Sequence, residues 1–258
     1  MDPARTVTLT TSDGVAIACD YWPAGESELA YVVAHGFTGS RSIPRVRRIS
    51  TQLADTGAAV LSLDFRGHGG SGGYSTVGDL EVHDLTAAVS FLRSEGYPTV
   101  VVLGWSMGGS VALRHAGLGG DVDGVVSVSS PGHWWERGTP PMRLVHWAAE
   151  TRLGRLATRL ATRTRLGTTG WEELPQSPVE VVAQIAPRPL LIVHGDADRY
   201  FPIRHAEALV AAAEGSAEFW RELGMGHAES ATTPELIGRI DRWARAALDS
   251  TAKERLRP

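Results

Sequence analysis

The chain has 258 residues, a length that suits one α/β domain or two smaller domains. Hydrophobic residues make up 43% and charged residues 21% of the sequence, proportions that are globular and exclude a disordered or collagen-like chain. The formal net charge of −4 argues against nucleic acid as a partner.

The sequence carries no recognisable targeting or membrane-spanning segment. After Arg5 the N-terminal stretch lacks the apolar run of a secretory signal. No stretch approaches the roughly 20 apolar residues of a membrane helix. Cys19 is the single cysteine, so no disulfide can form within the chain. We therefore expect a cytoplasmic protein without a membrane span.

Eight short runs, mostly apolar and rich in β-branched residues, predict strands. They cover residues 6–10, 15–22, 31–36, 58–65, 99–106, 124–130, 189–195 and 217–223. The first two runs alternate between apolar and polar residues and are separated by Ser12-Asp13-Gly14, which predicts a hairpin. The middle runs are continuously apolar, as in strands that are buried on both faces of a parallel sheet.

Helical patterns alternate with the later strands. Apolar residues recur at helical spacing over 44–56, 80–92, 107–116, 203–213 and 234–248. Pro202 and Pro234 stand where the first turn of a helix accepts proline. The alternation predicts an α/β fold with a mostly parallel, eight-stranded, doubly wound sheet.

The segment from 131 to 187 interrupts this alternation. One or two amphipathic helices are predicted there by the helical spacing of Met142, Val145, Ala149, Leu153, Leu156 and Leu160. Seven arginines and a single acidic residue, Glu150, lie between positions 137 and 165. We expect a helical cap over a core of residues 1–130 and 188–258. The arginines form either an anion-binding face or only a solvated one.

The strongest chemical signal is the stretch Gly104-Trp105-Ser106-Met107-Gly108-Gly109. It matches G-x-S-x-G and lies between a strand pattern and a helix pattern. A serine hydroxyl is a weak nucleophile that must be presented to a base, and a sharp strand-to-helix turn presents it. Glycines at 104 and 108 leave room where this turn crowds the backbone. The following helix directs backbone N–H groups toward a developing oxyanion.

Four motifs together resemble the serine hydrolase branch of the α/β-hydrolase superfamily. In chain order they are His35-Gly36-Phe37-Thr38-Gly39-Ser40, Asp64-Phe65-Arg66-Gly67-His68-Gly69-Gly70-Ser71-Gly72, the Ser106 motif, and His194-Gly195-Asp196-Ala197-Asp198 followed by Gly224-Met225-Gly226-His227. The resemblance covers nearly the whole chain outside 131–187. It is closest to carboxylesterases and to monoacylglycerol-lipase-like or cinnamoyl-esterase-like hydrolases, and it implies the α/β-hydrolase fold.

The resemblance also implies a Ser-His-Asp catalytic triad. Ser106 is expected as the nucleophile. The base is expected to be His227, since this fold runs serine, acid and then histidine along the chain. The family pattern His-Gly-x-x-Asp places the acid at Asp198, which would orient the imidazole of His227. Asp196 remains the alternative acid, although an aspartate in a turn more often binds loop backbone N–H groups.

Two backbone N–H groups are expected to form the oxyanion hole. One belongs to Met107, which follows the nucleophile, and by resemblance the other belongs to Phe37. Arg66 and Asp64 are expected to tie loops together rather than to act in catalysis. No pair of histidines has convincing metal-ligand spacing, so we expect neither a metal nor another cofactor.

The expected reaction is hydrolysis of a carboxylic ester, with a small or medium acyl or aryl ester as the small-molecule substrate. Trp134, Trp135 and Trp147 in the cap either line the substrate pocket or bury the cap against the core. A thioesterase or acyltransferase acting on a thioester, a lactonase, an amidase or a perhydrolase could use the same triad. A ligand-binding protein without catalysis is a further alternative. Both a monomer and a homodimer remain open.

Overall fold

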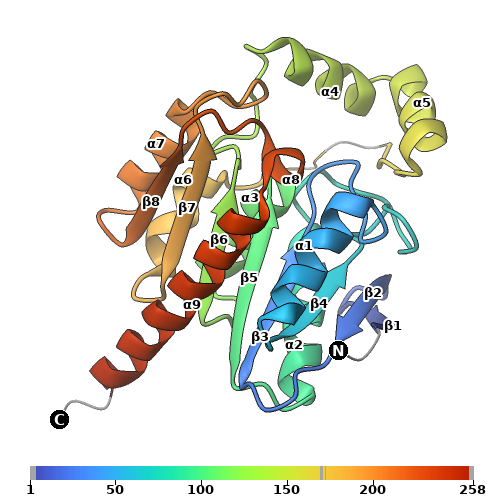
Figure 1. The fold of residues 1–258 in the computed structure, drawn as a ribbon. Coiled ribbons are helices and arrows are strands. Elements are labelled where there is room, and N and C mark those ends of the chain that lie inside the picture. Colours follow the sequence, from blue (N-terminus) through green and yellow to red (C-terminus); the bar gives the residue numbers. More distant parts are fainter. Residues whose placement is uncertain (1–3, 169–170, 172, 256–258) are drawn as a thin grey trace.

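The structure is a computed structural model that describes residues 4–168, 171 and 173–255. Within these residues eight strands form one sheet: β1 (Arg5–Thr10), β2 (Ala16–Trp22), β3 (Leu29–Ala34), β4 (Ala59–Leu63), β5 (Thr99–Trp105), β6 (Gly124–Val128), β7 (Leu190–Gly195) and β8 (Ala217–Glu222). Their spatial order is β1-β2-β4-β3-β5-β6-β7-β8. Strands β4, β3, β5, β6, β7 and β8 are parallel, so their carboxyl ends share one edge, which is at the top of Figure 1.

The predicted hairpin is confirmed. β1 pairs with β2 in antiparallel register, and Thr11 and Gly14 close the turn between them by backbone hydrogen bonds. Gly14 has φ +81°, a conformation that favours glycine. β2 then pairs antiparallel with β4 and joins the hairpin to the parallel part of the sheet. The predicted mostly parallel, eight-stranded α/β sheet is therefore confirmed.

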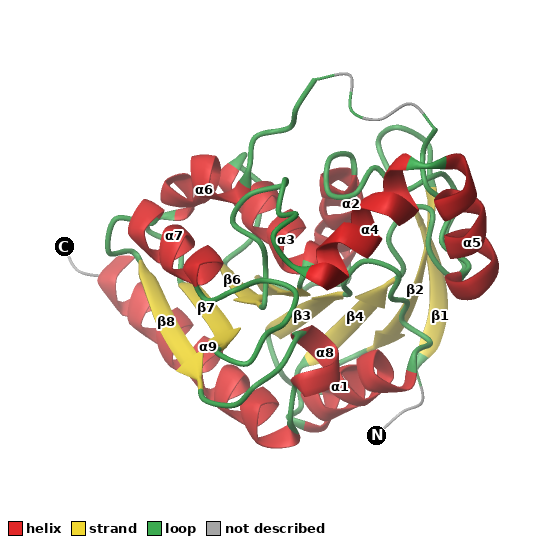
Figure 2. Cartoon of the chain, turned by 90° about the horizontal axis from the view of Figure 1, so that it is seen from above, coloured by secondary structure: helices red, strands yellow, loops and turns green. Residues whose placement is uncertain are grey.

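Helices cover both faces of the sheet (Figures 1 and 2). α1 (Pro44–Asp55) and α9 (Pro234–Arg255) cover one face, and α2 (Glu81–Ser94), α3 (Met107–Gly117) and α7 (Arg204–Ala212) cover the other. Along β3, Val32 packs in the core cluster under α2 and α3, whereas Tyr31 and Val33 pack in the cluster under α1 and α9. Because successive side chains point to opposite faces, a strand buried on both sides is continuously apolar.

The segment after β6 leaves the sheet and forms two helices above its carboxyl edge. They are α4 (Pro140–Glu150) and α5 (Arg152–Thr162), separated by Thr151, which is extended with φ −103° and ψ 148°. The Thr151 side chain accepts the Gly154 N–H and caps the start of α5. Figure 2 shows α4 crossing above the sheet and α5 on the β1–β2 side. The loop that follows α5 is described only in part.

The chain returns to the core before residue 188. A short helix α6 (Pro178–Val181) and a 3-10 turn η1 (Val182–Ile185) follow the loop, and Val182 and Ile185 are fully buried in the core cluster. The sequence patterns did not predict these turns, nor α8 (Ala228–Ala231), because each is too short to show a period. None of the described helices combines the length and hydropathy that a membrane span requires.

The close approach of α3 to β3 depends on Gly108 in the first turn of α3. A Cβ atom at this position would lie 2.3 Å from the carbonyl oxygen of Ala34 and 2.5 Å from that of His35. Both contacts are with backbone, so relief would require moving the helix or the strand. This packing fixes where the turn between β5 and α3 lies.

We expect Gly108→Ala to lower the free energy of unfolding by about 1–3 kcal/mol, the usual cost of forcing extra atoms into a packed interior. Urea unfolding measures the change. Gly25→Ala is the matched control, since a Cβ atom at Gly25 meets nothing within 4 Å and its φ is not positive. Equal stability of the two variants would contradict this account of the packing.

Candidate active site

Ser106 occupies a tight turn between β5 and α3. Its φ of 51° and ψ of −118° are strained for a residue other than glycine. A Cβ atom at Gly104 would lie 2.3 Å from the Gly108 carbonyl oxygen, so the predicted need for small residues on both sides of the serine is confirmed. The Ser106 N–H donates to the Val128 carbonyl at 2.9 Å and ties the turn to the end of β6.

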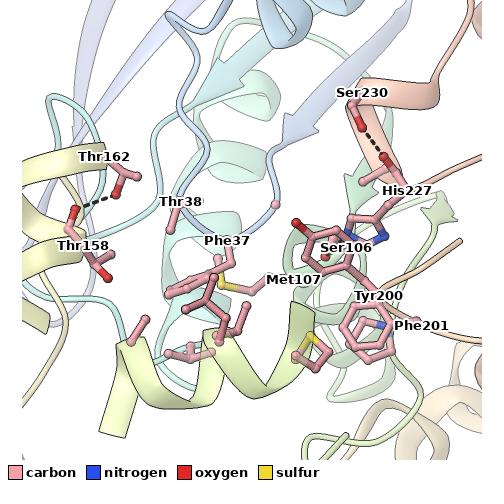
Figure 3. A pocket seen from close by; sticks show the side chains of 18 of the residues that line it. Phe37, Thr38, Ser106, Met107, Thr158, Thr162, Tyr200, Phe201, His227 and Ser230 are labelled. Carbon is pink, nitrogen blue, oxygen red and sulfur yellow. Dashed lines mark hydrogen bonds between the residues drawn. The ribbon is translucent and has the colours of Figure 1, made fainter. Parts of the chain in front are cut away.

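A chain of hydrogen bonds links Ser106 to the two other residues predicted for the triad. The Oγ atom of Ser106 is 3.1 Å from His227 Nε2, and His227 Nδ1 is 2.7 Å from Asp198 Oδ2. Ser106 follows β5, Asp198 follows β7, and His227 follows β8, so three loops at the carboxyl edge of the sheet supply them. Figure 3 shows the imidazole of His227 beside Ser106.

The surroundings of Asp198 favour its ionised form. Burial alone would raise the pKa of this carboxyl, but the hydrogen bond from His227 and the backbone N–H groups of Phe201 and Tyr200 outweigh burial and lower the pKa. An ionised carboxylate only accepts hydrogen bonds, so the proton between Asp198 and His227 is carried by Nδ1. The Nε2 atom of a neutral His227 is then free to accept the proton of the Ser106 hydroxyl.

Asp196 lies apart from this chain of hydrogen bonds. Its Oδ1 atom accepts the Gly224 N–H at 2.7 Å, which holds the turn after β8. It therefore binds loop backbone, as the sequence analysis expected of an aspartate in a turn.

Two residues that sequence reasoning missed, Tyr200 and Ser129, hold His227 in place. The ring of Tyr200 stacks on the His227 imidazole, with 4.3 Å between centroids and 22° between planes (Figure 3). The Ser129 hydroxyl accepts the N–H of Ala228, which has a φ of 52°. These positions carry no motif, because their partners lie far away in the sequence.

The Gly36–Phe37 peptide is oriented by the His35 side chain. The Nε2 atom of His35 accepts the Phe65 N–H, so its Nδ1 atom carries the proton and donates to the Gly36 carbonyl at 2.7 Å. Burial lowers the pKa of His35 and keeps the ring neutral. Because the C=O and N–H of a trans peptide point in opposite directions, the N–H of Phe37 points away from His35.

Glu229 holds the same loop from the other side. Its buried carboxylate accepts the Gly36 N–H at 2.7 Å and so connects the loop after β3 to the loop that carries His227. No sequence motif pointed to Glu229. The N–H of Met107 begins α3, where a helix has no internal acceptor for it. Phe37 and Met107 both line the cavity beside Ser106 (Figure 3).

A cavity of about 520 Å³ opens beside Ser106, between the core and helices α4 and α5. Its wall is largely apolar and includes Phe37, Val77, Met107, Met142, Val145 and Trp147. In Figure 3, Thr158 and Thr162 of α5 lie on the side opposite His227. This is the size and character of a small-molecule site.

The predicted cap tryptophans divide between two cavities. Trp134 and Trp147 line the cavity of Ser106. Trp135 instead lines a neighbouring cavity of about 700 Å³, which Trp134 and Trp171 also line. Trp135 stacks on His146 and lies over Arg137.

Two further buried polar side chains, Arg66 and Asp64, hold loops together. Arg66 bridges Asp13 and Asp84, and Asp64 pairs with Arg41 and accepts the N–H of Gly70, in line with their expected structural roles. Within the residues that the structure describes, no group of three or more His, Cys, Asp or Glu side chains is arranged to hold a metal ion.

Known proteins share this sequence pattern and fold. Residues 25–177 match the family described as "Serine aminopeptidase, S33". A curated relative, a monoacylglycerol lipase of Mycolicibacterium smegmatis, is 27% identical over 238 residues, with 76% of this chain and 80% of the relative covered.

Two solved structures illustrate the likeness in fold. An esterase of Pyrococcus furiosus is 24% identical with a TM-score of 0.75, and the match covers 95% of this chain and 91% of the esterase. A serine hydrolase of Xanthomonas campestris described as lacking a lid is 18% identical with a TM-score of 0.65, and 95% of each chain is covered. These likenesses confirm the α/β-hydrolase fold.

Substitution of Glu229 tests how the loop after β3 is held to the segment that carries His227. We expect Glu229→Ala to lower the free energy of unfolding by about 1–3 kcal/mol, because the buried Gly36 N–H loses its acceptor. Glu229→Gln keeps an acceptor oxygen and should restore most of the loss. Urea unfolding of both variants measures the effect. A glutamine variant as unstable as the alanine variant would show that the hydrogen bond to Gly36 is not the cause.

Proposed function

The chain belongs to the hydrolase family described as "Serine aminopeptidase, S33", and we propose that it is a serine esterase that cleaves a carboxylic ester through an acyl-enzyme. The observation that carries this proposal is the hydrogen-bond chain from Ser106 through His227 to Asp198. The names of the related lipase and esterase support the ester as the bond that is cleaved.

In the proposed first half-reaction, Ser106 Oγ attacks the carbonyl carbon of the ester. His227 Nε2 takes the hydroxyl proton as the new C–O bond forms, and Asp198 stabilises the imidazolium. The carbonyl oxygen becomes an oxyanion, for which the N–H groups of Phe37 and Met107 are the proposed donors. His227 then gives its proton to the leaving alcohol, the old ester bond breaks, and the acyl group remains on Ser106.

In the second half-reaction water takes the place of the alcohol. His227 Nε2 removes a proton from water as the water oxygen attacks the acyl carbon. The same two N–H groups are proposed to stabilise the second oxyanion. Collapse of this intermediate returns the proton to Ser106 Oγ and releases the carboxylic acid.

We propose that the segment 131–187 acts as a cap through its helices α4 and α5 and selects the substrate. Trp134 and Trp147 would contact an apolar acyl or alcohol group, since both line the cavity of Ser106. Trp135 would contact only a substrate that extends into the second cavity. A glycerol monoester is the first candidate, on the name of the curated relative.

The thioester alternative gains little support from the cap arginines. Arg45 is the one arginine on the described wall of the Ser106 cavity, whereas Arg152, Arg159 and Arg163 do not line it. An anionic group inside the Ser106 cavity would therefore meet Arg45, whereas Arg155 of α5 lines only the neighbouring cavity.

Hydrolysis of an amide at a free amino terminus is a second candidate, on the description of the family. Recognition of an ammonium group needs an available carboxylate, and Glu229 is the one acidic residue on the described wall of the cavity. Its Oε1 atom already accepts the Gly36 N–H. The ester is the better candidate because the related lipase and esterase are named for ester cleavage. If aminoacyl p-nitroanilides were cleaved faster than p-nitrophenyl esters, the amide would become the better candidate.

We expect hydrolysis of p-nitrophenyl esters between acetate and decanoate, with kcat reduced about 10⁶-fold in Ser106→Ala. The acyl chain length that is hydrolysed fastest would indicate the size of the part of the cavity that holds the acyl group. A wild-type protein inactive on the whole series would contradict a general esterase and favour a thioester, a lactone or a ligand-binding role.

Substitution can show which of Asp198 and Asp196 is the acid of the triad. Asp198→Asn should lower kcat about 10⁴-fold, because the amide favours the wrong tautomer of His227. Asp196→Asn keeps an acceptor for the Gly224 N–H and should change kcat by less than about tenfold. Steady-state kinetics of the two variants decide between them, and the opposite ranking would assign the acid to Asp196.

A further inference from the structure

The outer face of α5 exposes three leucines. Leu153, Leu156 and Leu160 are 67%, 53% and 77% exposed, and their spacing places them in one stripe along the helix. The opposite side of α5 is the one that is buried, through Gly154 and Thr158. The apolar residues that predict this helix therefore do not cover the core.

Helix α4, the other helix of the cap, also exposes apolar side chains. Leu144 is 64% exposed and Trp147 is 41% exposed, and both also line the Ser106 cavity. We call the five residues Leu144, Trp147, Leu153, Leu156 and Leu160 the cap patch. Exposed apolar side chains that gather in this way mark a site of association more often than single scattered ones do.

Arginines lie beside the leucines of the cap patch. Arg152 and Arg159 directly precede Leu153 and Leu160, which places each about 100° around the helix from its leucine. Within the described part of the chain, Arg152, Arg159 and Arg163 form no ion pair, and Glu150 is taken by Arg137 and His146. The positive charge beside the cap patch is therefore not neutralised by the protein itself.

We propose that the cap patch and these arginines dock on the surface of an anionic phospholipid bilayer. An amphipathic helix lies in the bilayer interface with its apolar face among the upper acyl chains and its basic residues at the headgroups. Arginine matches phosphate oxygens through paired N–H donors. With three arginines and two short helices, the attachment would be reversible.

Charge favours a lipid surface over a second copy of this chain. Seven arginines against one acid lie between positions 137 and 165, so two cap patches facing each other would repel. An anionic leaflet instead attracts each arginine near its surface. Docking by itself needs no catalysis. If the proposed esterase activity holds, docking would also bring the cap that covers the Ser106 cavity to a surface that holds dissolved esters.

The test is co-sedimentation of the full chain with vesicles of phosphatidylcholine alone or mixed with phosphatidylglycerol. We expect binding to the mixed vesicles that weakens with salt, and much weaker binding to phosphatidylcholine. Each arginine near the leaflet strengthens binding about fivefold, so the triple variant Arg152→Gln, Arg159→Gln, Arg163→Gln should bind about 100-fold more weakly. The triple variant Leu153→Ser, Leu156→Ser, Leu160→Ser should also lose binding, since burial of its leucines is lost.

Two matched controls keep the result specific to α5. Leu118→Ser removes an exposed leucine just after the end of α3, and Arg242→Gln removes an exposed arginine from α9, so both variants should bind like the wild type. Ser106→Ala should bind fully, which separates docking from the esterase proposal. Thermal melting checks the fold of each variant. Absence of binding at low salt, unchanged binding by either α5 triple variant, or concentration-dependent dimers without vesicles would overturn the proposal.

Discussion

The turn between β5 and α3 is the constraint on which the site depends. It can be this tight because Gly104 and Gly108 leave no Cβ atom where the backbones of β3, β5 and α3 meet. The strained φ of Ser106 is held by this packing and by its bond to the end of β6. The hydroxyl therefore stands at the carboxyl edge of the sheet, where the loops after β7 and β8 bring Asp198 and His227.

The charge of Asp198 then determines which nitrogen of His227 can act as a base. An ionised Asp198 fixes the proton of His227 on Nδ1, so the nitrogen nearest Ser106 is the one that can act as a base. His35 and Glu229 hold the Gly36–Phe37 loop from two sides, and Glu229 lies in α8, directly after His227 at the start of that helix. The proposed oxyanion donor and the proposed base are thus supported by one connected set of hydrogen bonds.

Local sequence pattern predicted the strands, the hairpin, the long helices and the surroundings of Ser106, because each depends on burial or on turn chemistry within a few residues. Asp198 and His227 needed the family resemblance as well as their positions after strands. Glu229, Tyr200 and Ser129 could not be predicted, since their roles arise from contacts with residues distant in the chain. The α5 leucines show the converse limit: periodicity predicted the helix, but only the structure shows that its apolar face points outward.

The central claim is that Ser106, His227 and Asp198 act as one catalytic unit, and a double-mutant cycle tests it most directly. The kcat/KM of an ester is measured for the wild type, His227→Ala, Asp198→Asn and the double variant. If Asp198 acts through the imidazole, the double variant loses no more activity than His227→Ala alone. Losses that multiply, as they do for independent residues, would contradict the account.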